Sequence, residues 1–147
     1  MEKTIINTKS VLSAFAAVGG FLAHALGGWD AALKTLLGFM VADYITGMMV
    51  AALWKRSNKS ETGALDSKAS FKGLCKKGVI LILVCLGELL GEATGVSDVR
   101  TMLVLFFIGN EGLSLLENLS IMGVPFPPVI KNMLEVMKDK GNEKKPG

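Results

Sequence analysis

Carboxylates and amides interrupt an otherwise apolar stretch of the sequence, residues 99–122. Five polar side chains fall within an arc of about 120° if this stretch is a helix with 100° per residue: Asn110, Glu111, Ser114, Glu117 and Asn118. At mid-membrane a charged side chain costs about 2.5–3.5 kcal/mol, whereas a large apolar residue contributes only about 0.3–0.6 kcal/mol. The polar face therefore needs partners. Either other helices of the same chain supply them or, as we favour, identical faces of further copies gather around water, which would make these five residues pore-facing.

Another carboxylate, Asp43, lies inside the apolar stretch 31–54. Gly47 and Ala51 follow at four-residue spacing on nearly the same helix face, which predicts a close helix contact beside it. Carboxylates inside a membrane usually face a partner or water. Asp43 therefore either has a functional role or bonds Thr46 or a neighbouring helix and only fixes packing.

Small residues also repeat at four-residue spacing in the stretch 10–28, where Ala16, Gly20 and His24 share one face. In lipid, small residues let helices approach closely, because packing replaces the hydrophobic effect as the driving force. We therefore interpret Ala16 and Gly20 as a helix-packing face. The alternative is a loosely apolar helix in which the glycines are incidental.

The sequence contains no recognisable set of catalytic or metal-binding residues. The sequence has one histidine, no metal-ligand spacing, no glycine-rich phosphate loop and no Ser/His/Asp set. We therefore predict no catalytic residue, no metal site, no cofactor and no nucleic-acid partner.

The elements that carry these residues are long apolar stretches. Half of the 147 residues are hydrophobic, and the mean hydropathy is +0.46, which is typical of membrane proteins. Four stretches are close to the ~20 residues that cross a bilayer as a helix, at about 10–28, 31–54, 78–95 and 99–122. We predict an all-α integral membrane protein with about four transmembrane helices in two hairpins. The stretch 10–28 is the least apolar, so three spans are the alternative.

Basic residues are concentrated in the connection 55–77 and in the tail. The positive-inside rule places both on the cytoplasmic side, and an even number of spans then places both termini there. Prolines after residue 122 end the last span. Apolar residues at i, i+3, i+4 and i+7 spacing from Ile130 to Met137 predict an amphipathic helix on the cytoplasmic membrane face, within an amphipathic helix and tail over 127–147. We expect residues 141–147 to be disordered and the two cysteines to be free thiols.

Several motifs together resemble the toxin-secretion/phage-lysis holin family. They are DYITG at 43–47, SFKGLCKK at 70–77, NEGLSLLEN at 110–118 and GVPFP at 123–127. The resemblance implies a multi-pass protein of the bacterial cytoplasmic membrane that oligomerises and opens lesions for host lysis. Its partners would be further copies of itself, the lipid bilayer, and an endolysin or toxin as passing cargo. The alternatives are a small ion or metabolite channel subunit and a membrane scaffold that binds cytoplasmic partners on the basic connection.

Overall fold

The computed structural model describes residues 2–57, 59 and 61–142 of the chain. Over these residues every regular element is a helix, and there is no strand. In chain order the elements are α1 (Glu2–Ala25), α2 (Ala31–Met49), the π-helical turn η1 (Val50–Trp54), α3 (Ser67–Thr94), α4 (Val99–Met122) and α5 (Pro128–Asn142). The predicted all-α fold is confirmed for the part of the chain that the structure describes.

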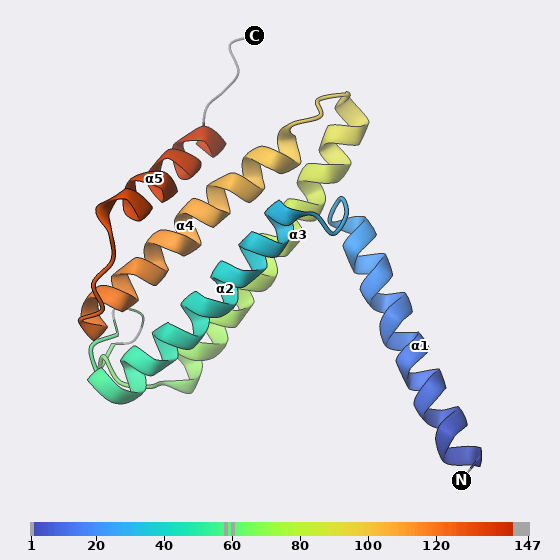
Figure 1. Ribbon diagram of the computed structural model, residues 1–147, viewed down its shortest axis with the longest axis horizontal. Helices are drawn as coiled ribbons and strands as arrows, with labels where there is room; N and C mark the ends of the chain where they lie inside the picture. Colours follow the sequence, from blue (N-terminus) through green and yellow to red (C-terminus); the bar gives the residue numbers. More distant parts are fainter. Residues whose placement is uncertain (1, 58, 60, 143–147) are drawn as a thin grey trace.

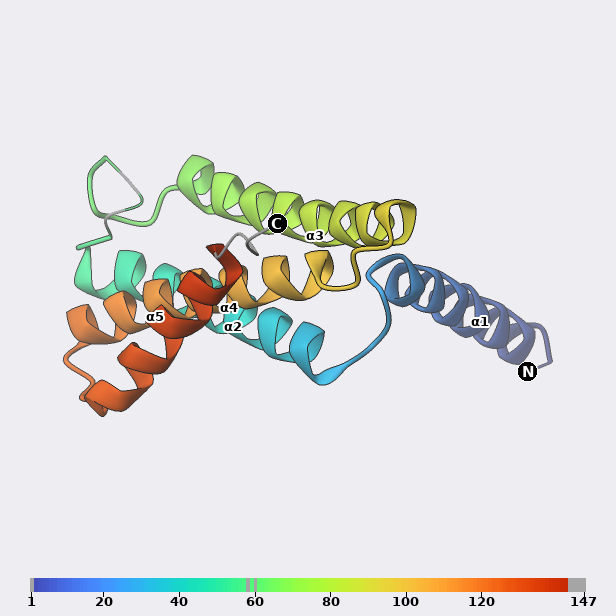
Figure 2. The same cartoon turned by 90° about the horizontal axis from the view of Figure 1, so that it is seen from above.

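Helix α4 is the centre of the molecule. Helices α2, α3 and α5 all pack against it, whereas α1 projects away from the bundle, as Figures 1 and 2 show from two directions. The core consists of apolar side chains from these four packed helices: Leu36, Met40, Ile80, Val84, Val104, Ile108, Leu116 and Leu134. The residues of α2, α3 and α4 that face this core are thereby fixed relative to one another.

Short polar residues set where the helices begin. Asp30 caps α2, because its Oδ1 accepts a hydrogen bond of 2.8 Å from the backbone N–H of Leu33. Asp66 caps α3 in the same way by accepting from the N–H of Lys68. Helix α4 ends at Gly123, whose φ of 77° is a left-handed conformation that glycine adopts without strain. The chain can therefore reverse at this point and enter α5.

Helix α5 doubles back along α4. Its predicted position on the cytoplasmic membrane face stays a prediction, and the structure packs α5 lengthwise against α4 (Figure 1). Glycines allow the close approach: a Cβ added to Gly109 would lie 2.5 Å from the backbone oxygen of Leu134, and one added to Gly112 would lie 2.6 Å from the Leu134 side chain. Leu134, which is 4% exposed, is the buried anchor of α5.

Two helical segments are long and apolar enough to cross a membrane. They are Ala31–Trp54, which combines α2 and η1, and Val99–Met122, which is α4. Both coincide with predicted spans. Among the described residues, α1 and α3 are not long and apolar enough by the same measure, so the structure supports two of the four predicted spans and does not show the other two.

The basic connection is shorter than predicted. We expected it over 55–77, but α3 begins at Ser67, so that the segment 67–77 is helical and only 55–66 connects the helices. The Asp66 cap explains the early start, which a search for continuous apolar residues cannot detect. Both cysteines are free, as predicted. Of the tail expected to be disordered, Gly141 and Asn142 belong to α5, and residues 143–147 lie outside the described residues.

Candidate functional site

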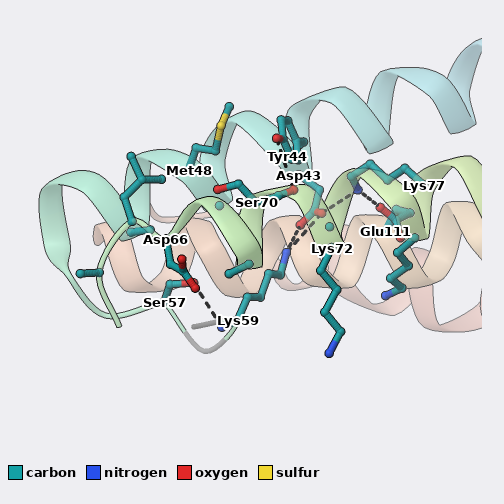
Figure 3. Close-up of a pocket in the computed structure, with 17 residues that line it drawn as sticks. Asp43, Tyr44, Met48, Ser57, Lys59, Asp66, Ser70, Lys72, Lys77 and Glu111 are labelled. Atoms are coloured by element: carbon teal, nitrogen blue, oxygen red, sulfur yellow. Dashed lines mark hydrogen bonds and ion pairs between the residues drawn. The ribbon is translucent and has the colours of Figure 1, made fainter. Parts of the chain in front are cut away.

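Two carboxylates meet at the middle of the two apolar segments. Asp43 lies halfway along Ala31–Trp54 and Glu111 halfway along Val99–Met122, and they are only 4% and 2% exposed. Lys77 of α3 lies between them. Its Nζ lies 2.8 Å from Asp43 Oδ2 and also forms an ion pair with Glu111 Oε2 (Figure 3). A single ammonium group therefore joins carboxylates of α2 and α4.

Asn118 and Lys59 complete the hydrogen bonding of Asp43. The Asn118 Nδ2, one of the buried polar groups of α4, donates to Asp43 Oδ1 at 3.1 Å and to Thr46 Oγ1 at 3.0 Å. Lys59, from the connection between α2 and α3, places its Nζ 3.0 Å from Asp43 Oδ1. We refer to Asp43, Lys59, Lys77, Glu111 and Asn118 as the polar network.

The polar network is balanced in charge and only partly shielded from water. Its two carboxylates face two ammonium groups; the Lys77 side chain is 11% exposed, whereas that of Lys59 is 49% exposed. Removing charges from water costs several kcal/mol per ion, and pairing in a low-dielectric interior roughly offsets that cost. The network therefore fixes α2, α3 and α4 relative to one another, but its net contribution to stability is expected to be small.

The five predicted pore-facing residues separate into two groups. Glu111 and Asn118 are buried inside the bundle, and Ser114 is half-buried. Asn110 is half-buried and Glu117 is exposed. In a single copy of the chain, then, part of the polar face has partners within the bundle, and Glu117 faces outward.

The four predicted packing residues also separate into two groups, one packed inside the bundle and one on α1. A Cβ added to Gly47 would lie 3.6 Å from Asn118 Nδ2, and Ala51 is 7% exposed, so both lie against neighbouring groups of the bundle. Ala16 and Gly20 are on α1, where Ala16 is exposed and a Cβ added to Gly20 would have no neighbour within 4 Å. At Gly20, the small-residue face of α1 therefore has no close neighbour among the described residues.

Sequence reasoning missed the basic members of the polar network. Lys77 and Lys59 were assigned to the solvated basic connection, although Lys77 belongs to α3. One signal was available, because Lys77 directly precedes the apolar residues 78–86. A lysine at the start of an apolar helix can place its ammonium group beside a carboxylate of a neighbouring helix.

A second charged cluster lies at the opposite end of the bundle, around Arg100 of α4. Arg100 is 8% exposed. Its Nη1 donates to Asp30 Oδ2 at 2.7 Å, its Nε lies 3.8 Å from Glu88 Oε2, and it also bonds the backbone oxygen of Leu26. The hydrogen bond from Arg100 is the main cause that lowers the pKa of Asp30 below its usual value. This cluster connects the end of α1 to α2, α3 and α4.

The outer surface of the bundle carries large apolar side chains, although charged groups are buried inside the bundle. Exposed side chains include Val41 and Ile45 on α2, Leu53 on η1, and Ile82, Leu86 and Leu90 on α3. A protein surrounded by water rarely exposes so many large apolar groups. Charged groups inside and apolar groups outside are the arrangement expected of helices surrounded by lipid.

Comparisons with known proteins agree with this arrangement. The bacteriophage holin family model matches residues 20–139. The chain is 33% identical to an uncharacterized protein of Clostridium perfringens over 86% of its own length and 90% of that protein, and 35% identical to one of Listeria monocytogenes over 88% and 85%. It is also 32% identical to a probable holin of Bacillus phage phi105, over 76% of its own length and 78% of that protein. No solved structure matches. The match over residues 20–139 covers most of the chain, which therefore belongs to the bacteriophage holin family.

Proposed function

We propose that the chain is a holin that oligomerises in the bacterial cytoplasmic membrane and forms lesions through which an endolysin or toxin passes. The observation that carries this proposal is the polar network at the centre of the two apolar segments, where Asp43, Lys77 and Glu111 are paired inside a bundle with an apolar exterior. Membership of the holin family supports it.

The free energy of the polar network would allow its charged groups to exchange their partners in the bundle for water. Because pairing of buried charges only about offsets their desolvation, transferring the same groups to water is expected to cost little overall. In a lesion, the α4 polar faces of several copies would surround a water-filled opening. Water would then hydrate Glu111, Ser114 and Asn118. A single copy would thus remain closed while it accumulates, and assembly would open the polar face.

The proposal includes a topology. We propose that α1 and α3 cross the membrane along with α2 and α4, that both termini are cytoplasmic, and that the basic connection 55–66 and the first turns of α3 lie at the cytoplasmic surface. The lysines and arginine at this end of the bundle support that orientation. The short turns near Trp29 and Ser97 would then be external.

A leakage experiment tests the proposed function. The full chain is induced in bacteria with and without a co-expressed endolysin, and the purified chain is added to vesicles loaded with dextrans of increasing size. We expect lysis only when both proteins are present, together with release of dextrans large enough to represent a folded enzyme. Release of small ions alone would contradict the holin assignment and favour a channel subunit, and no release at all would favour a scaffold.

A further inference from the structure

A cavity of about 490 Å³ lies between α2 and the first turns of α3. Ser57, Lys59 and Leu65 of the connection line it, and so do Asp43, Lys77 and Glu111 of the polar network (Figure 3). Small residues leave the space open, since Gly47 and Ala51 of the α2–η1 segment and Ala69 and Gly73 of α3 all line it. Its volume is within the range of sites that hold small molecules.

Two lysines at this cavity have no carboxylate partner among the described residues. Lys77 and Lys59 are occupied by the polar network. Lys72 and Lys76 are one helical turn apart on α3, both are exposed, and neither takes part in an ion pair of the described residues. Figure 3 shows the Lys72 side chain extending away from Asp43. Two lysines of the same α3 face therefore line the cavity without a carboxylate partner among the described residues.

The remaining walls determine what kind of anion would fit. Met48 and Leu65 provide apolar surface, and Tyr44 places its ring in the cavity while its hydroxyl donates to the Ser70 backbone oxygen at 3.4 Å. Asp66 also lines the cavity, but its Oδ1 accepts from the backbone N–H of Lys68 as the α3 cap. A ligand with an anionic group and an adjoining apolar part could pair with the lysines and also contact the apolar side chains.

The position of the cavity along the helices points to lipid. It lies beside the second half of Ala31–Trp54, toward the end of the bundle that carries the basic connection. Basic pockets between helices on the cytoplasmic side are suited to the phosphate groups of acidic lipids. We propose that this cavity binds the headgroup phosphate of an anionic phospholipid through Lys72 and Lys76, with the start of the acyl region against Met48 and Leu65. The proposal requires α2 to lie in the membrane but does not depend on lesion formation.

Binding is measured on the full purified chain in detergent, by native mass spectrometry during titration with phosphatidylglycerol. Phosphatidylcholine and inorganic phosphate are titrated in parallel. We expect phosphatidylglycerol to bind at least tenfold more tightly than either, and Lys72→Gln/Lys76→Gln to weaken it about tenfold or more, because each surface lysine contributes measurably to acidic-lipid binding. Equal binding of phosphatidylcholine, or binding of inorganic phosphate as tight as that of the lipid, would overturn the proposal.

Two further variants separate the cavity from general charge attraction. Lys131→Gln/Lys140→Gln removes the same charge from exposed positions on α5 and should leave phosphatidylglycerol binding within about twofold, if the cavity supplies the affinity. Ala69→Leu reduces the cavity without changing charge and should weaken binding. Circular dichroism checks that each variant is folded. An equal loss in the α5 control, or unchanged binding in folded Ala69→Leu, would show that the cavity is not the site.

Discussion

Helices α4 and α1 have similar lengths and opposite surroundings. Helix α4 contacts α2, α3 and α5, and it buries the charged side chains of Arg100 and Glu111. Helix α1 exposes large apolar side chains, among them Phe15, Val18 and Phe21, and joins the bundle only near its end. Part of the polar face of α4 therefore already has partners in a single copy, whereas the apolar faces of α1 need lipid or another copy.

Because of this contrast, we expect α4 to determine the stability of a single copy and α1 to affect assembly between copies. Changes in α4 should alter the free energy of unfolding of one copy, because its neighbours come from the same chain. Changes in α1 should leave that free energy unchanged and should alter only what happens between copies.

Removing Lys77 should have the largest effect. Lys77→Met leaves Glu111 without its ion-pair partner while Asp43 keeps Lys59, and breaking a buried pair from one side costs about 3–5 kcal/mol. Chemical unfolding of the purified chain in detergent measures this loss. Lys77→Met/Glu111→Leu should recover part of the lost stability, because the unpaired carboxylate is gone. Lys34→Met, at an exposed position of α2, is the control, and a loss no larger than the control's would show that the pair is unimportant.

Enlarging Gly109 should have the next largest effect. A leucine there would collide with the backbone of α5 at Leu134, and overpacking of this kind costs about 1–3 kcal/mol. We expect α5 to detach and become accessible to limited proteolysis. Gly38→Leu is the matched control, since a Cβ at Gly38 has no neighbour within 4 Å. Equal protease resistance in the two variants would argue against the observed packing of α5 on α4.

A smaller effect is expected at the Arg100 cluster. Because the folded state lowers the pKa of Asp30, the pair contributes its full stability above the ordinary pKa of 3.8 and loses it as pH falls through the lower folded value. Asp30 is 45% exposed, so the contribution should stay below about 1 kcal/mol. Asp30→Asn keeps a capping side chain and should remove this part of the acid dependence of unfolding. An unchanged acid dependence would contradict the role of the pair.

Substitution of Gly20 should leave the stability of one copy unchanged. Gly20→Leu has no neighbour to displace among the described residues, yet it should hold copies apart if the small-residue face of α1 packs between copies. We expect fewer crosslinked oligomers and delayed lysis. Gly19→Leu is the control, because Gly19 is equally open but points about 100° away around the helix. Identical behaviour of the two variants would exclude this face as an interface.

Hydropathy located α2 and α4 correctly because capping and helix-ending residues coincide with the limits of their apolar stretches. Asp30 precedes one and Gly123 follows the other. The same reasoning placed the start of α3 eleven residues too late, since Ser67–Lys77 is helical but polar. Capping by Asp66 was the signal to follow.

The polar network could be predicted only in part. The positions of Asp43 and Glu111 inside apolar stretches showed that each needs a partner. Which partner could not be deduced, because the basic segment offers several lysines and only the packing of α3 on α4 selects Lys77. The position of α5 was also beyond the sequence pattern, which predicts its apolar face but not the surface that covers it.

The central claim is that the α4 face which is enclosed in one copy faces water in the lesion. Ser114→Cys, in a background lacking Cys75 and Cys85, tests it with a membrane-impermeant thiol reagent added to cells before and after lysis begins. Leu105→Cys, on the opposite side of α4, is the control. We predict that Cys at position 114 reacts only after lesions form and that Cys at position 105 does not react at either time. Position 114 remaining unreactive during lysis, or both positions reacting equally, would contradict the account.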